Sequence, residues 1–72
     1  MRISARNQLS GVVDSVHEGD VMTEVTVRLT GGESVVSAIT TESAKRLGIA
    51  KGKAVTVIVK STEVMLGVDD GR

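Results

Sequence analysis

The sequence predicts an all-β domain with one short helix. Residues 21–30 alternate between two kinds of side chain, and every second residue from Val21 to Leu29 is Val, Thr or Leu. This is the pattern of a strand with one buried face. Gly31–Gly32 follows directly and is a two-residue hairpin signal. Only residues 40–48 have the spacing of a helix. Three strands, one helix and two further strands indicate an OB-like five-stranded antiparallel β-barrel.

The first predicted strand covers residues 1–16. Apolar residues recur on one parity from Ile3 to Leu9, with polar residues between them, so one face is expected to be buried. Gly11 interrupts this pattern and indicates either a bulge or a close approach of two backbones. A turn is expected at residues 17–20.

The helix has local start and stop signals. Thr40 is a good N-cap, because its hydroxyl can accept a hydrogen bond from the amide of Ser43. An acidic residue in the first turn and basic residues in the last turn suit the helix dipole. Gly48 can end the helix in a left-handed conformation. A helix this short is marginal alone, so we expect it to pack on the sheet.

The remaining strands have less regular patterns. Residues 33–39 are predicted to form the third strand and to run directly into the helix. Residues 54–60 are β-branched at nearly every position, so this strand is expected to be buried on both faces. Residues 61–63 break it, and residues 64–67 are predicted to form a short fifth strand.

Seventy-two residues are enough for one small domain. We predict that it covers residues 1–67 and that residues 68–72 form a flexible tail. The chain has no aromatic residue, proline or cysteine, so its core must be aliphatic. Domains of this size bury a modest share of their surface and usually need disulfides, a metal or partner subunits. Association of subunits is therefore expected.

Charge and composition argue against several classes of function. Nine basic and nine acidic residues give a formal net charge of zero, which argues against nucleic acid and anionic membranes as partners. We find no signal peptide or membrane-spanning run and expect a cytoplasmic protein. His17 is the one histidine and is isolated in a turn, and the carboxylates are scattered, so neither an enzyme nor a metal centre is expected.

Three short clusters combine hydroxyl groups with a cation at strand or helix ends. They are Ser4–Ala5–Arg6–Asn7, Thr40–Thr41–Glu42–Ser43 with Arg46, and Lys60–Ser61. Hydroxyls, backbone amides and cations all donate hydrogen bonds, so each cluster suits an anion. The same residues are also consistent with helix capping and solvated surface charge. The residues alone leave both interpretations open.

Three segments of the chain resemble one known family. They are Ile3–Leu9 with Gly11 and Val13, then Thr40–Gly48 with Gly52, and then Val57–Ser61 with Glu63, Val64, Met65 and Gly67. In this order and at these separations they resemble the molbindin (Mop) domain, a Mop/TOBE domain, in its stand-alone single-domain form. The resemblance extends from Met1 to about Gly67.

The resemblance implies a cytoplasmic protein for molybdenum storage and homeostasis. It would bind molybdate, and tungstate by mimicry, at subunit interfaces of a homo-hexamer that is a trimer of dimers, with the metal held only as an oxyanion. The implied contacts are Ser4 and Arg6 of one chain, with Ala5 and Asn7 beside them, and Thr40, Ser43, Arg46, Lys60 and Ser61 of a neighbour, with Val59 contributing only its backbone.

The donor-only character of the clusters favours an unprotonated dianion. Hydrogen phosphate would need an acceptor, and Glu42 is the one residue of these clusters that carries negative charge. Molybdate and tungstate are too similar for the sequence to distinguish them. Two alternatives stay open: an OB-like nucleic-acid-binding module, weakened by the lack of aromatic residues, and a purely structural oligomerisation module.

Overall fold

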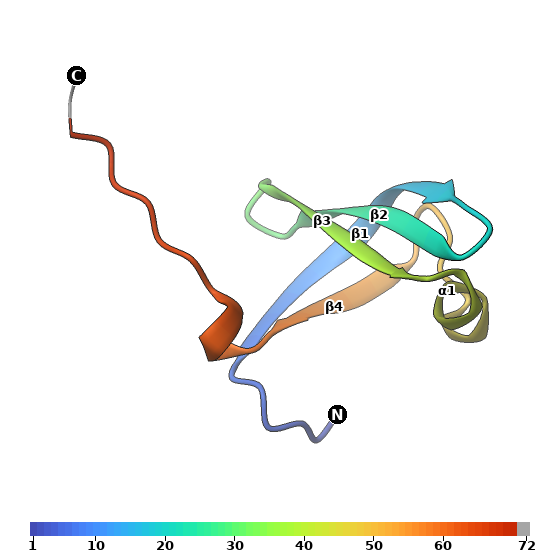
Figure 1. The fold of residues 1–72 in the computed structure, drawn as a ribbon, viewed down its shortest axis with the longest axis horizontal. Helices are drawn as coiled ribbons and strands as arrows, with labels where there is room; N and C mark the ends of the chain where they lie inside the picture. The colour runs from blue at the N-terminus through green and yellow to red at the C-terminus, as the bar shows by residue number, and fades with distance from the viewer. Residues whose placement is uncertain (71–72) are drawn as a thin grey trace.

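A computed structural model describes residues 1–70 of the chain (Figure 1). The elements are β1 (Asn7–Glu18), β2 (Met22–Leu29), β3 (Ser34–Thr40), α1 (Thr41–Leu47), β4 (Ala54–Val59) and a 3-10 turn, η1 (Ser61–Glu63). The predicted class, mostly β with one short helix, is confirmed. No helix within the described residues is long and apolar enough to span a membrane.

The four strands form one antiparallel sheet in the order β3-β2-β1-β4. The strands β1 and β2 pair as one hairpin and β2 and β3 as a second, and β4 returns to pair with the free side of β1. Because β3 and β4 do not pair with each other, the curled sheet is an open half-barrel with two edge strands. The helix α1 continues β3 and contacts β3 and β2 (Figure 1).

The core lies on one face of this sheet and is small. Val13, Val25 and Val27 are buried, and partly buried aliphatic side chains pack against them from β2, β3, β4 and the loop after α1. The predicted core face of the second strand is confirmed from Thr23 onward. Val21 is instead 73% exposed, because it precedes the first paired residue of β2.

The first strand begins later than predicted, at Asn7. Gly11 lies where β1 and β2 approach closely: a Cβ there would be 2.6 Å from Val27 Cγ1 and 2.7 Å from the carbonyl oxygen of Arg28. The register shift of this ladder falls elsewhere, between Val13 and Ser15. Of the two interpretations of Gly11, the close approach is correct.

The predicted fifth strand at residues 64–67 is wrong for this chain. After η1 the backbone leaves the sheet, so no strand lies beside these residues to pair with them (Figure 1). The sheet therefore has four strands. Of the predicted flexible tail, residues 71–72 lie outside the described part of the chain.

The strand β4 is buried on one face rather than on both. Val55, Val57 and Val59 are partly buried, whereas the residues between them are exposed. The physical reason is the open sheet, since β4 is an edge strand and only its inner face has core residues to pack against.

Candidate functional site

Two of the three hydroxyl-and-cation clusters meet at one end of the sheet. The ladder between β1 and β4 pairs Asn7 with Val59. This register places Asn7 and Val59, the adjoining ends of the segments Ser4–Asn7 and Val59–Ser61, side by side, although the two segments lie at opposite ends of the sequence. Figure 1 shows the start of β1 next to the end of β4, on the side of the sheet away from α1.

The cations at this end of the sheet are not neutralised by any residue of the described part of the chain. Arg6 and Lys60 are both exposed, and neither makes an ion pair within residues 1–70. Ala5 is buried, and its carbonyl oxygen accepts a hydrogen bond of 3.0 Å from Gln8 Nε2, which orders the backbone before β1. The two positive charges and the hydroxyls of Ser4 and Ser61 are thus available to a ligand.

The third cluster lies at the start of α1, and its N-cap prediction is confirmed. The amide of Ser43 donates to Thr40 Oγ1 over 3.1 Å, and the Thr40 hydroxyl donates to Ser43 Oγ over 2.7 Å. The hydroxyl hydrogen of Ser43 is therefore left for another acceptor. Arg46 lies three residues further, on the same side of the helix. Gly48 ends α1 with φ of 67°, as predicted.

A buried hydroxyl pair fixes the start of α1, and the sequence analysis did not identify it. The Thr41 hydroxyl donates to the carbonyl oxygen of Gly19 over 2.6 Å, and Thr41 Oγ1 lies 2.8 Å from Thr23 Oγ1. Since Thr41 has one hydroxyl hydrogen, Thr23 must be the donor of the second bond. The Thr41 amide also donates to the carbonyl oxygen of Val21 over 2.8 Å. These contacts tie the helix start to the β1–β2 turn.

One chain does not bring all three clusters together. Asn7 begins β1 and Glu18 ends it, roughly 35 Å further along an extended strand. The helix start belongs to the Glu18 end, because Glu18 pairs with Thr23 and the adjoining Met22 pairs with Thr40. A single anion cannot contact both ends of the sheet.

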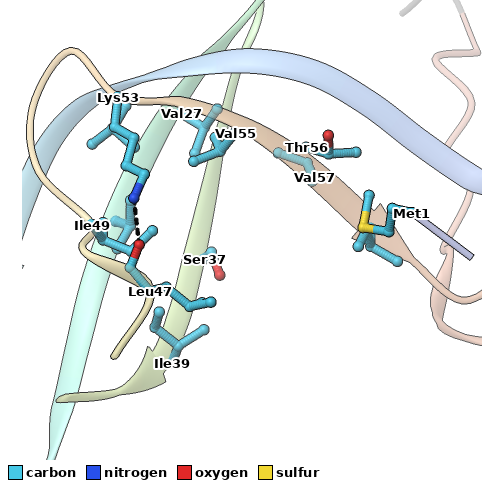
Figure 2. Close-up of a pocket in the computed structure, with 13 residues that line it drawn as sticks. Met1, Val27, Ser37, Ile39, Leu47, Ile49, Lys53, Val55, Thr56 and Val57 are labelled. Atoms are coloured by element: carbon cyan, nitrogen blue, oxygen red, sulfur yellow. Dashed lines mark hydrogen bonds between the residues drawn. The ribbon is translucent and has the colours of Figure 1, made fainter. Parts of the chain in front are cut away.

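The concave face of the sheet is mainly apolar, unlike the three polar clusters. It holds a cavity of about 400 Å³, lined mainly by aliphatic side chains of β2, β3, β4 and the loop after α1 (Figure 2). The cation that lines it, Lys53, donates from Nζ to the carbonyl oxygen of Leu47 over 2.5 Å. This surface offers an oxyanion few donors, so the polar clusters are the better candidate site. Within residues 1–70 no group of three or more His, Cys, Asp or Glu side chains could hold a metal ion.

Comparison with known proteins identifies the family. A profile described as the TOBE domain matches residues 3–66. Molybdenum-pterin-binding protein 3 of Clostridium pasteurianum is 46% identical over 66 residues, which cover 92% of this chain and 97% of that protein. This relative is named as a binding protein, in agreement with the expectation from the sequence.

Two solved structures share the fold. A molybdate-binding protein from Sporomusa ovata superposes with a TM-score of 0.88 at 35% identity, covering 94% of this chain and all of that one. The cytoplasmic molybdate-binding protein ModG, solved with molybdate bound, has a TM-score of 0.81 at 39% identity, covering 92% of this chain and 53% of that one. The resemblance recognised in the sequence is confirmed, and the chain belongs to the TOBE-domain family of Mop proteins.

Proposed function

We propose that this protein binds molybdate, and tungstate by mimicry, and serves molybdenum storage and homeostasis in the cytoplasm. The observation that carries the proposal is the β1–β4 register, which brings Asn7 and Val59, the adjoining ends of two donor clusters, side by side. The cations of these clusters, Arg6 and Lys60, make no ion pair within residues 1–70. The proposal is supported by the Sporomusa protein and by ModG, both named as molybdate-binding, the second also as cytoplasmic.

The chemistry of the donors fits a fully ionised tetrahedral oxyanion. The oxygens of such an anion only accept hydrogen bonds, and the hydroxyls of Ser4 and Ser61, the Arg6 guanidinium and the Lys60 ammonium can all donate. A protonated oxyanion would bring a hydrogen for which these groups offer no charged acceptor. We therefore expect a preference for molybdate over hydrogen phosphate.

We further propose that each anion lies between chains of a homo-hexamer that is a trimer of dimers. Since the two ends of one sheet are far apart, the paired clusters of one chain would face the helix cluster of a neighbour. The donors are Ser4, Arg6, Lys60 and Ser61 of one chain, with Ala5, Asn7 and Val59 adjoining them, and Thr40, Ser43 and Arg46 of the other. This division differs from the one that the family resemblance implies, because β1 and β4 of one chain are hydrogen-bonded neighbours.

A thermal-unfolding experiment with matched anions tests the proposal. Molybdate or tungstate at a hundred times its dissociation constant should stabilise the folded protein by about 2.7 kcal/mol per site. Sodium chloride at the same ionic strength is the control for a general salt effect, since chloride is neither tetrahedral nor a dianion. The mass in solution, measured by light scattering with and without molybdate, should be that of six chains.

The alternatives predict other outcomes of this experiment. A purely structural oligomerisation module would have the mass of an assembly but show no difference between molybdate and chloride at equal ionic strength. A nucleic-acid-binding module would be stabilised by an oligonucleotide instead. A folded monomer with full molybdate affinity would contradict the location of the site between chains.

A further inference from the structure

The helix α1 is fixed on the sheet by polar contacts at its start as well as by apolar packing. Of its seven residues, Thr41 and Ala44 are buried. A helix this short is marginal alone and takes its position from its contacts with the rest of the fold. The contacts of Thr41 therefore decide where the first turn of the helix lies.

Thr41 is the middle member of a chain of hydrogen bonds, here called the hydroxyl chain (Thr23, Thr41 and the carbonyl oxygen of Gly19). The Thr23 hydroxyl donates to Thr41 Oγ1 over 2.8 Å, and the Thr41 hydroxyl donates to Gly19 over 2.6 Å. Thr23 is 0% exposed and Thr41 is 6% exposed, so water hardly competes with either bond. The hydroxyl chain joins β2 and the β1–β2 turn to the first residue of α1.

The carbonyl oxygen that receives the Thr41 hydroxyl belongs to a tightly packed turn. The Gly19 amide donates to the carbonyl oxygen of Met22 over 3.0 Å, and Met22 pairs with Thr40 in the β2–β3 ladder. A Cβ at Gly19 would lie 2.5 Å from the carbonyl oxygen of Met22, so a side chain there would shift the turn. The turn and the residue before the helix are thus tied to the same residue of β2.

Two of the proposed anion donors lie next to the hydroxyl chain. Thr40 directly precedes Thr41, Ser43 follows two residues later, and the Thr40 hydroxyl donates to Ser43 Oγ over 2.7 Å. A hydrogen bond weakens steeply when its donor is displaced or turned away from the acceptor. The direction of these two hydroxyls depends on the backbone of the first turn, and Thr41 holds this backbone on the sheet.

We propose that Thr23 and Thr41 are positioning residues for the oxyanion site, which orient the hydroxyls of Thr40 and Ser43 without touching the anion. Thr23 is buried and acts through Thr41. The inference rests on the proposed function and deepens it, because it makes the affinity depend on residues outside the donor set. It also extends the site to the β1–β2 turn, whose Gly19 carbonyl ends the hydroxyl chain.

Isothermal titration with molybdate on a graded series of variants tests the positioning role. Thr41→Val removes both bonds of the hydroxyl chain, while the shape and helix propensity of the side chain change little. It should weaken binding about tenfold, the size expected when one or two neutral hydrogen bonds to the anion are lost. Thr41→Ser keeps the hydroxyl and should restore the affinity to within about twofold of that of the unsubstituted protein.

Thr23→Val is the second variant, and it decides the matter if Thr41→Val does not fold. It removes one bond and leaves Thr41 bonded to Gly19, so no buried donor loses its acceptor. It should therefore fold and weaken molybdate binding about threefold. Unchanged affinity of folded Thr23→Val would overturn the proposal.

Val27→Ala is the matched control for a general loss of stability. Val27 is buried on β2, where it pairs with Val13 and Val35, and its truncation leaves a cavity in the core. The hydroxyl chain stays intact, so molybdate affinity should stay close to that of the unsubstituted protein. Circular dichroism and light scattering report the fold and the mass of each variant. Equal weakening in Val27→Ala and Thr41→Val would show that affinity follows global stability, and the proposal would be wrong.

The outcomes separate this inference from the proposed function. Absence of molybdate binding by the unsubstituted protein would contradict both. If the unsubstituted protein binds molybdate and folded Thr41→Val binds it equally well, the proposed function stands and the positioning role is refuted. Weaker binding by Thr41→Val, its rescue by Thr41→Ser and unchanged binding by Val27→Ala would support the positioning role, because a loss of stability alone would also lower the affinity of Val27→Ala.

Discussion

Lys60→Ala is expected to weaken molybdate binding by about ten- to a hundredfold, because a hydrogen bond to a charged group contributes about 1.5–3 kcal/mol. The Lys60 ammonium has no ion-pair partner within residues 1–70, so its charge is available to the anion. Arg6→Ala should have an effect of the same size, since Arg6 directly precedes Asn7, whose ladder partner Val59 directly precedes Lys60. Isothermal titration with molybdate measures both.

Two further variants serve as internal references for this series. Ser43→Ala removes a neutral donor and should cost about 1 kcal/mol of binding free energy. Lys45→Ala removes an exposed cation next to Arg46 that matches no contact position of the family. It should leave binding almost unchanged, because salt screens an exposed charge at a distance. If Lys45→Ala weakened binding as much as Lys60→Ala, the anion would be attracted only by a diffuse positive field. The proposal of a specific site would then be wrong.

Thr41→Val is expected to be the most destabilising polar substitution near the helix. The new side chain has nearly the same shape, so packing changes little. However, the carbonyl oxygen of Gly19 loses its donor and the buried hydroxyl of Thr23 loses its acceptor. Each group left unsatisfied costs about 1–3 kcal/mol, which is a large part of the roughly 5–15 kcal/mol that stabilises a typical domain.

Thr41→Ser is the matched control for this substitution. It keeps the hydroxyl and both hydrogen bonds and removes only a methyl group, so it should cost about 1 kcal/mol. Denaturant unfolding of the two variants at one protein concentration gives the comparison. Equal stabilities for Thr41→Val and Thr41→Ser would show that the hydroxyl contributes little to holding the helix start.

The features that could be predicted from the sequence depend on neighbours along the chain. The alternation from Thr23 to Leu29 reports which side of that strand is buried, whatever strand lies beside it. The cap at Thr40 and the left-handed conformation of Gly48 each depend on hydrogen bonds to residues about one helical turn away. Each of these signals is local, and the structure confirms each of them.

The features that could not be predicted depend on partners across the sheet. A β-branched run such as Ala54–Val59 indicates a strand but does not show whether a second layer covers its outer face. Residues 64–67 have a strand-like pattern, yet pairing needs an adjacent edge, and after η1 the backbone runs away from both edges of the sheet. A sequence pattern shows which face of a strand is apolar, whereas the order of the strands in the sheet decides which faces and edges are covered.

The same limit applies to the candidate site. The donors could be found because hydroxyls and cations recur at element ends, and the family resemblance gave them a role. The proximity of the segments around Asn7 and Val59 could not be derived, since it depends on a non-local ladder. In the sequence pattern, Thr23 does not differ from any other β-branched residue of the core face. A polar side chain among Val25 and Val27 was the available signal that it has a buried partner.

The β1–β4 ladder also bears on the order in which the molecule folds. Glu18 meets Thr23 across a tight turn, whereas Asn7 meets Val59 only after nearly the whole chain is gathered. Closing the longer loop costs about 2 kcal/mol more in chain entropy. We therefore expect the two hairpins to form first and β4 to add last.

Local opening should follow the reverse order, with β4 leaving the sheet while the hairpins persist. The polar clusters would then separate without global unfolding. Amide hydrogen exchange should consequently be faster in β4 than in β2, and molybdate should slow it most in β4. Equal slowing in both strands would mean that the anion protects the molecule only as a whole.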